Sequence, residues 1–301
     1  MIDAAALARA VPMSAAIDAL EGAFGAPLPA APPRSHVETD GGTLLLMPAH
    51  GPPGVGVKLV TLTPGNPDRN LPFIHAVYVL FDAETQAPLA LLDGAALTAL
   101  RTAAVSGLAT RHLARPDARR LVLYGAGVQA RSHLEAMRAV RPIEELVIVS
   151  RGRERAEALA EHARAAGLLA RIGDPGAEAE ADIVCTCTTS IQPVVRGALL
   201  AEGAHVNAVG AYTKGMRELD AEAIRRARVV VETRAAAAAE AGDLALAMAE
   251  GVVGEDHVVA DLSEVVAGGR VRRVDREVTV FKSVGVAFED LVVARAVLDR
   301  R

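Results

Sequence analysis

Lys58 stands in the middle of GVKLVTL, an apolar run whose valines and leucines are typical of a β-strand. A lysine at such a position can lay its methylene groups along apolar neighbours and keep its ammonium group in water. The same ammonium group can instead serve as a fixed positive charge that binds an anionic ligand. The strand by itself leaves both interpretations open.

Arg101 is a second cation among apolar residues. On the helix predicted between Asp93 and Pro116, the residues on the same face as Arg101 are apolar. They are Leu97, four positions before it, and Ala104, Val105 and Leu108, which are three, four and seven positions after it. Arg101 therefore lies on the apolar face of that helix. A buried guanidinium group is costly unless it is paired. We expect Arg101 either to bind an anionic ligand or to pair with an Asp or Glu of the chain.

The segment LVLYGAGVQA places Gly125 and Gly127 between a predicted strand and a predicted helix, with Ala130 completing a Gly-x-Gly-x-x-Gly/Ala pattern. Such a turn needs tight backbone geometry, a residue without a side chain where a pyrophosphate approaches, and a small residue where helix meets strand. The helix start adds N–H groups and a positive dipole end, so Val128 and Gln129 are further candidate cofactor contacts. The pattern predicts a dinucleotide site, the alternative being an ordinary strand–helix turn.

The second strand of this βαβ unit ends at Ser150 and Arg151, where an NAD site would carry an Asp or Glu for the ribose hydroxyl groups. A guanidinium group instead suits the 2′-phosphate of NADP, through charge-assisted, bidentate hydrogen bonds. Ser150 and Arg151 are therefore candidate cofactor contacts, and the sequence predicts NADPH in preference to NADH. The alternative is an arginine that is simply solvated at the start of a helix.

Two regions with different patterns must position these residues. Residues 1–25 predict helical structure, and short alternating runs over 37–92 predict a mainly antiparallel sheet. After Arg119, strands and helices alternate, which is typical of a parallel, doubly wound sheet. The alanine-rich stretch 234–251 predicts one further helix, and 279–300 a strand that runs into an amphipathic helix. The expected fold class is α/β.

The composition restricts the kinds of partner. A chain of 301 residues is long enough for two domains. Its 32 Lys and Arg against 37 Asp and Glu give a net charge of −5, so no global positive field attracts nucleic acid or a membrane surface. No apolar run is long enough for a membrane helix, and the N-terminus lacks the features of a signal peptide. Cys185 and Cys187 are too close for a mutual disulfide, so a cytoplasmic location is expected.

Seven segments resemble, in order, the landmarks of the ornithine cyclodeaminase/mu-crystallin family. They are PPRSHV, GVKLVTLTPGNP, LPFIHAVYVLFDAETQAPLALLDG, LTALRTAAVSGLAT, GAGVQA, VGAYTKGMRELD and TVFKSVG. The resemblance runs from about residue 30 to the C-terminus. It implies a Rossmann domain at 117–284 that binds NADP, and a substrate-binding and dimerisation domain at 1–116 that is completed by a helix at 285–301. It also implies a homodimer.

The resemblance further implies where the ligands bind. Arg34, by itself typical of a surface residue, would converge with Lys58 and Arg101 on the carboxylate group of the substrate near the nicotinamide. Arg101 would contact the cofactor as well. The other matched positions are Thr188, Thr189 and Ser283 for the cofactor and Val284 for the substrate. Lys58 is thereby interpreted as a carboxylate ligand and as the catalytic residue.

Members of this family divide by chemistry. Cyclodeaminases carry an aspartate after a late strand, in a Val-Gly-Gly/Ala-Asp sequence that serves the substrate amine, whereas Tyr212 takes that place here. The resemblance therefore implies an NADPH-dependent reductase of small cyclic imino acids, Δ1-pyrroline-2-carboxylate or Δ1-piperideine-2-carboxylate, that forms proline or pipecolate. The alternatives are a cyclodeaminase, an amino-acid dehydrogenase, and a non-catalytic NADPH-dependent ligand-binding protein of the mu-crystallin type.

No metal site is expected. Cys185 and Cys187 have one intervening residue and no histidine nearby, which does not match the ligand spacing of zinc sites, so two core thiols are expected. The chain also contains no His-Glu-x-x-His pattern. Asp220 lies too far along to replace the missing aspartate and is predicted to cap the next helix.

Overall fold

The computed structural model describes residues 1–29, 32–69 and 71–300. By packing, the chain divides into two units, which are Met1–Ala104 with Val286–Arg301 and Val105–Gly285. Helix α3 (Gly94–Leu113) contains the first division between the units. The domain boundary predicted after residue 116 lies just beyond the end of this helix.

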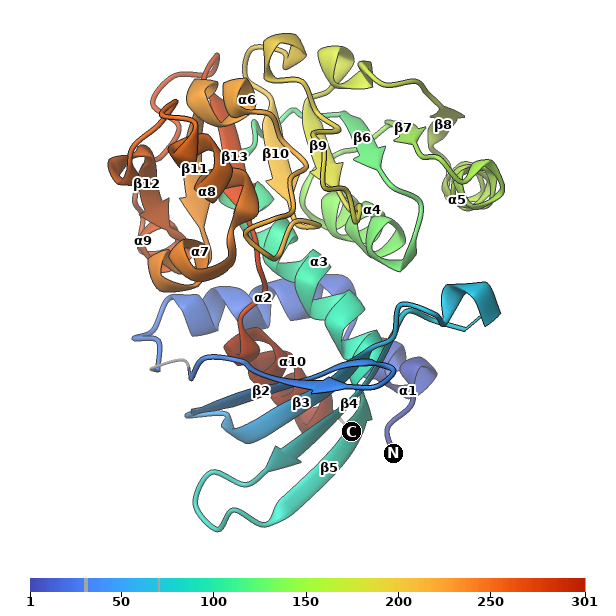
Figure 1. Ribbon diagram of the computed structural model, residues 1–301, viewed down its shortest axis with the longest axis vertical. Helices are drawn as coiled ribbons and strands as arrows, with labels where there is room; N and C mark the ends of the chain where they lie inside the picture. The colour runs from blue at the N-terminus through green and yellow to red at the C-terminus, as the bar shows by residue number, and fades with distance from the viewer. Residues whose placement is uncertain (30–31, 70, 301) are drawn as a thin grey trace. The chain divides into compact units, whose positions relative to one another are not determined.

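The first unit contains a five-stranded antiparallel sheet in the order β1-β2-β3-β4-β5 (Figure 1). Its strands are β1 Ser35–Thr39, β2 Gly42–Gly51, β3 Gly54–Leu62, β4 Ile74–Phe81 and β5 Pro88–Asp93. Its further helices are α1 Ala4–Ala10, α2 Met13–Phe24, the 3-10 turn η1 Pro67–Arg69 and α10 Ala287–Asp299. Helix α10 packs against α2 and against β2, β3 and β4. The antiparallel sheet and the helical N-terminus are as predicted.

Strand β3 shows how this sheet separates its two faces. A strand directs successive side chains to opposite faces, and in β3 the residues Gly56, Lys58 and Val60 are buried while Val57 and Leu59 are partly exposed. Lys58 lies on the face that α10 covers, since its ammonium group bonds to a side chain of that helix. The alternation therefore places the lysine in the core.

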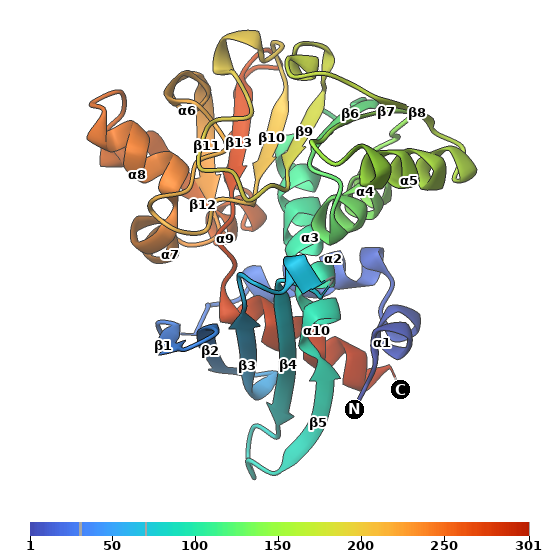
Figure 2. The same cartoon turned by 45° about the vertical axis from the view of Figure 1, so that its right-hand side comes forward.

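The second unit contains an eight-stranded parallel sheet in the order β12-β11-β13-β10-β9-β6-β7-β8 (Figure 2). Its strands are β6 Arg120–Tyr124, β7 Glu145–Val149, β8 Leu169–Ile172, β9 Ile183–Thr186, β10 His205–Ala208, β11 Ala227–Val231, β12 Val258–Asp261 and β13 Val278–Lys282. Its helices are α4 Val128–Val140, α5 Arg153–Ala165, α6 Ala221–Arg226, α7 Arg234–Glu240, α8 Gly242–Ala249 and α9 Leu262–Val266. The 3-10 turns are η2 Ala177–Glu180, η3 Gly197–Leu199 and η4 Glu255–His257. The predicted α/β class with a doubly wound sheet is confirmed.

Two helix predictions need correction. The single helix expected over 234–251 is two helices, α7 and α8, because the chain turns at Ala241 and Gly242. A Cβ on Gly242 would lie 2.1 Å from the carbonyl oxygen of Met216, so the close approach of two backbone segments requires glycine. The C-terminal helix is buried over 287–294 rather than amphipathic, because α2 and the sheet pack on it.

The predicted cap at Asp220 is confirmed, and Asp93 bonds to the first turn of α3 in a similar way. Asp93 Oδ1 accepts hydrogen bonds from the N–H groups of Ala95 and Ala96, each at 3.0 Å. Asp220 Oδ1 accepts one from the N–H group of Ala223 at 2.8 Å. Sequence reasoning missed the strands β8, β11 and β12, because periodicity alone does not distinguish such short runs from other buried segments.

Candidate active site

The glycine turn lies where the parallel sheet reverses its strand order. Strand β6 is followed along the chain by β7 and β8 on one side of it, whereas β9 and β10 lie on its other side. In open parallel sheets, ligands bind beyond the carboxyl ends of the strands at such a reversal. The turn that follows β6 and the segment that follows β9 therefore flank the place where this unit is expected to hold a dinucleotide.

Gly125 and Gly127 play different parts in this turn. Gly125 has a φ of +104°, and a Cβ there would lie 2.5 Å from the carbonyl oxygen of Cys187, so the fold itself requires glycine. Gly127 is the N-cap of α4, and a Cβ there would meet no atom within 4 Å. The next residues are Val128, which is 70% exposed, and Gln129. The open backbone at the helix start fits a pyrophosphate group.

Ser150 and Arg151 follow the strand next to this turn. Strand β7 pairs in parallel with β6, and the N–H group of Gly125 donates to the carbonyl oxygen of Val149 at 2.9 Å. Ser150 Oγ accepts a hydrogen bond from the N–H group of Gly152 at 3.3 Å, and Arg151 is exposed. The structure therefore brings the predicted phosphate ligand and the glycine turn to adjacent strand ends.

Thr188 is held by Glu218, a residue that sequence reasoning missed. The N–H and hydroxyl groups of Thr188 both donate to Glu218 Oε1 at 2.7 Å, whereas Thr189 is exposed. Glu218 Oε2 accepts from the Thr186 hydroxyl group at 2.7 Å and from the N–H group of Gly210 at 2.6 Å. Burial raises the pKa of Glu218, and the positive charge of a nearby lysine opposes this. One carboxylate thus fixes the segments after β9 and β10.

A second missed carboxylate, Glu232, fixes the segment after β13. Its Oε1 accepts from the Ser283 hydroxyl group at 2.6 Å, and its Oε2 accepts from the N–H group of Val284 at 2.9 Å. Gly285, with a φ of +78°, donates its N–H group to both oxygens. Ser283 and Val284 are buried. The predicted ligand contacts of this segment are therefore held in one conformation by Glu232.

The first unit buries Lys58 and Arg101 together. Lys58 Nζ lies 3.0 Å and 2.8 Å from the two carboxylate oxygens of Asp290 and is not in water, so the interpretation of a snorkelling lysine is wrong. Arg101 donates to Glu289 Oε2 at 2.7 Å, and its Nε lies 3.2 Å from Asp290 Oδ1. The expectation that an acidic residue of the chain pairs with Arg101 is confirmed. Two acidic residues within an apolar helix were the signal that could have identified these partners.

The surroundings of Lys58 lower its pKa. Burial and the positive charges of Arg101 and Arg34 together lower the pKa of Lys58 to about 8, although Asp290 acts in the opposite direction. Arg34 is half-buried, and its positive charge acts on Lys58, so the charges of the three predicted carboxylate ligands influence one another. Burial also raises the pKa of Tyr78, which is opposite Lys58 in the sheet.

The sequence also singled out Tyr212, Asp220 and the two cysteines. Tyr212 lies in the segment after β10 and is half-buried, whereas Asp220 is engaged as the cap of α6. Burial raises the pKa of the Cys185 thiol to about 12, which disfavours the thiolate that a metal needs. Among the described residues, no three His, Cys, Asp or Glu side chains are grouped so that they could hold a metal ion.

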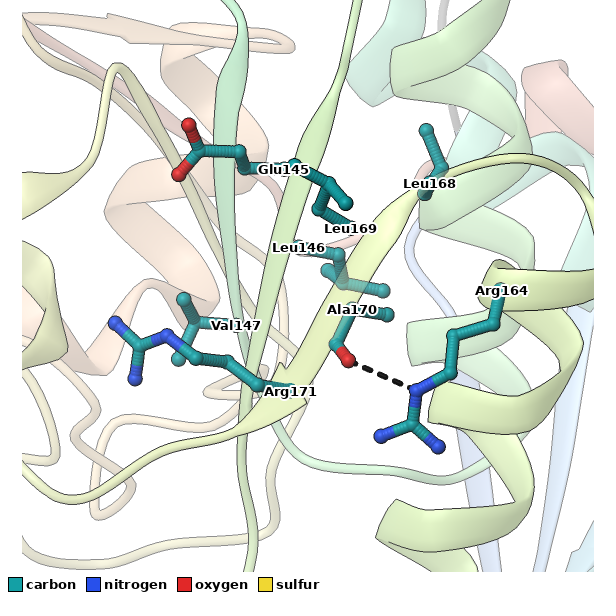
Figure 3. A pocket seen from close by; sticks show the side chains of 8 residues that line it. All are labelled: Glu145, Leu146, Val147, Arg164, Leu168, Leu169, Ala170 and Arg171. Atoms are coloured by element: carbon teal, nitrogen blue, oxygen red, sulfur yellow. Dashed lines mark hydrogen bonds between the residues drawn. The ribbon is translucent and has the colours of Figure 1, made fainter.

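A hollow between α5, β7 and β8 is a separate feature of the second unit (Figure 3). It is lined by Glu145, Leu146, Val147, Arg164, Leu168, Leu169, Ala170 and Arg171. Glu145 and Leu169 are the first residues of their strands, so the hollow lies toward the amino ends, opposite to the end where a dinucleotide is expected. Arg164 Nε donates to the carbonyl oxygen of Ala170 at 3.0 Å. The hollow is therefore not the candidate site.

Comparison with known proteins identifies the family. The family model described as the ornithine cyclodeaminase/mu-crystallin family matches residues 1–301. The chain belongs to this family. A Delta(1)-pyrroline-2-carboxylate reductase of Bacillus cereus is 41% identical over 270 residues, which are 86% of this chain and 81% of that protein.

Two solved structures are also similar to this chain. One is the Thermococcus litoralis Delta(1)-pyrroline-2-carboxylate reductase in complex with NADH and L-proline, with a TM-score of 0.92, 36% identity, and coverage of 99% of this chain and 96% of that one. The other is an archaeal alanine dehydrogenase dimer with bound NAD, with a TM-score of 0.91, 34% identity, and coverage of 99% and 94%. These relatives confirm the expected enzyme class, an oxidoreductase that depends on a nicotinamide dinucleotide. No helix among the described residues is long and apolar enough to cross a membrane.

Proposed function

We propose that this protein uses NADPH to reduce a small cyclic imino acid, Δ1-pyrroline-2-carboxylate or Δ1-piperideine-2-carboxylate, to proline or pipecolate. The observation that carries the proposal is the buried ammonium group of Lys58 in a cluster with two arginines. A charge removed from water is costly, and a substrate carboxylate is the anion that such a cluster binds well. The similar reductases supply the substrate class.

In this proposal the residues divide the work between binding and orientation. Lys58, Arg101 and Arg34 hold the carboxylate of the imino acid, and Val284 contacts the substrate. Fixing the carboxylate orients the imine carbon and lowers the entropic part of the barrier. A bound nicotinamide supplies the hydride that this carbon accepts. The dinucleotide would be held by Arg101, Gly125, Gly127, Val128, Gln129, Ser150, Arg151, Thr188, Thr189 and Ser283.

Turnover of each cyclic imine with NADPH, followed by the absorbance of the reduced cofactor, tests this function. Steady oxidation of NADPH would exclude a non-catalytic ligand-binding protein. Ornithine with NAD should release little ammonia, because Tyr212 stands where cyclodeaminases carry the aspartate that serves the amine. Ammonia release from ornithine as fast as imine reduction would contradict the proposal and favour a cyclodeaminase.

Arg151→Ala should change the choice between the two cofactors. The variant should bind NADPH about ten- to a hundredfold more weakly, because a hydrogen bond to a charged group contributes about 1.5–3 kcal/mol. Affinity for NADH, which has no 2′-phosphate, should change little. Both affinities can be measured by titrating the fluorescence of the reduced cofactor. Arg171→Ala is the control, since this exposed arginine lies on β8 and pairs with Glu180. Equal loss for both cofactors would show that Arg151 supports the fold instead.

The sheet of the first unit supports the proposed homodimer. On the face opposite to Lys58, apolar residues lie side by side across neighbouring strands, with Val57 paired to Val79 and Val79 to Leu91. Leu91 is 42% exposed and Leu89 39%. A row of partly exposed apolar residues of this kind fits a protein interface, and a two-fold dimer would cover it with its own copy.

Val57→Lys should convert the dimer to a monomer in solution. The substitution places a charge at the centre of the proposed interface, where it loses its hydration without gaining a partner. Light scattering coupled to size-exclusion chromatography measures the mass directly. Leu169→Lys is the control, because Leu169 is 74% exposed on a strand of the second unit. A wild-type monomer, or a Val57→Lys variant that stays dimeric, would contradict this interface.

A further inference from the structure

Asp290 of α10 and Lys58 of β3 form a fully buried ion pair. The lysine Nζ lies 3.0 Å from one oxygen of the carboxylate and 2.8 Å from the other, and the two side chains are 2% and 0% exposed. A charge-assisted hydrogen bond to both oxygens restricts the direction of the ammonium group. Asp290 therefore determines where the lysine points.

The other charged and titratable groups around Lys58 come from several elements. They are Arg34 ahead of β1, Tyr78 of β4, Arg101 of α3 and Glu289 of α10. Burial and the two arginines favour the neutral amine, whereas attraction to Asp290 and the hydrogen bond with it favour the ammonium form. Glu289 accepts a hydrogen bond from Arg101 at 2.7 Å, whereas Asp290 pairs with Lys58 and also lies 3.2 Å from Arg101 Nε.

We propose that Asp290 is a positioning residue that keeps Lys58 charged and aimed at the carboxylate group of the substrate. This inference rests on the proposed reduction of an imino acid. Without Asp290, burial and two neighbouring arginines act on the lysine unopposed, and a neutral amine binds a carboxylate weakly.

Asp290→Asn should change the pH dependence of catalysis. The alkaline limb of kcat/KM should move about one to two pH units lower, because the asparagine removes the charge that favours the ammonium form. At pH 8, where the wild-type pKa of Lys58 lies, activity should fall about five- to fiftyfold, and part of it should return at pH 6.

Glu289→Gln is the matched control for this measurement. It removes the same charge from the neighbouring residue of the same helix, but its hydrogen bond is to Arg101, whose guanidinium group stays charged. Whatever the size of its kcat/KM value, its alkaline limb should lie at the same pH as that of the wild type. The same cyclic imine is used for all three proteins, so titration of the substrate affects them equally.

The pH dependence of thermal unfolding is a second readout and needs no turnover. Lys58 has a lower pKa in the folded protein than its ordinary value of 10.5, so burial of its charge destabilises the fold most below the folded-state pKa, about 8. This penalty declines as the pH rises above that value. In Asp290→Asn the decline starts at lower pH, so its Tm deficit should be largest near pH 6 and shrink toward pH 8. The deficit of Glu289→Gln should stay constant over that range.

The two readouts distinguish a wrong role for Asp290 from a wrong function. An unmoved alkaline limb together with a constant Tm deficit in Asp290→Asn would overturn the proposal and leave Asp290 a purely structural partner. If the Tm deficit of Asp290→Asn shrinks toward pH 8 but the wild-type protein turns over no cyclic imine, the proposed function is overturned, and so is the role of Asp290 in it. The coupling of Asp290 to Lys58 would still stand.

Discussion

Replacing Lys58 with methionine should lower kcat/KM for imine reduction by roughly thirtyfold to several thousandfold. Truncating one partner of a buried, hydrogen-bonded charge pair costs about 2–5 kcal/mol, and each 1.4 kcal/mol is about tenfold. Methionine retains most of the volume of the lysine stem and removes the charge that the substrate carboxylate would bind. Cofactor affinity should change little, since the glycine turn belongs to the second unit.

The same substitution should also lower Tm, and a second substitution separates the two effects. Loss of the lysine leaves Asp290 with Arg101 Nε at 3.2 Å, and breaking a buried pair costs about 3–5 kcal/mol. The double variant Lys58→Met/Asp290→Asn should recover much of the stability and none of the activity. Near-normal turnover by Lys58→Met would return the lysine to a structural role. Recovered activity in the double variant would mean that the single variant fails through instability.

Gly127→Ala should weaken dinucleotide binding about ten- to a hundredfold and leave Tm unchanged. Its φ of −89° suits alanine, and the added Cβ would meet no atom of the protein within 4 Å. The methyl group would instead occupy the space beside the helix start, where hydrogen bonds to a charged pyrophosphate contribute about 1.5–3 kcal/mol. Calorimetric titration with NADPH and thermal unfolding measure the two quantities.

Gly125→Ala is the contrasting variant of the same turn. Its φ of +104° is unfavourable for alanine, and the new Cβ would lie 2.5 Å from a backbone oxygen of the strand segment after β9. We expect it to lose about 2–4 kcal/mol of folding stability as well as cofactor affinity. Unchanged NADPH affinity in folded Gly127→Ala would contradict the assignment of this turn to the cofactor, whatever Gly125→Ala does.

The sequence predicted the structure correctly where the deciding pattern or contact involves residues that are close together in the chain. Alternation of strands and helices after Arg119 predicted the parallel sheet, and the spacing of Gly125 and Gly127 predicted the turn at its reversal point. The cap at Asp220 was likewise predicted, because a cap contacts N–H groups only a few residues away. The break between α7 and α8 was missed because it depends on Met216, which is distant in the sequence.

The partners of the buried charges show what only the tertiary structure decided. The apolar surroundings of Arg101 predicted an acidic partner or a ligand, yet Glu289 lies 188 residues away along the chain, and Asp290 lies 232 residues from Lys58. The sequence by itself determined the fold class and the position of the dinucleotide turn, because propensity and spacing act over a few residues. Only the tertiary structure decided which carboxylates meet the two cations, because that depends on the C-terminal helix packing against the sheet of the first unit.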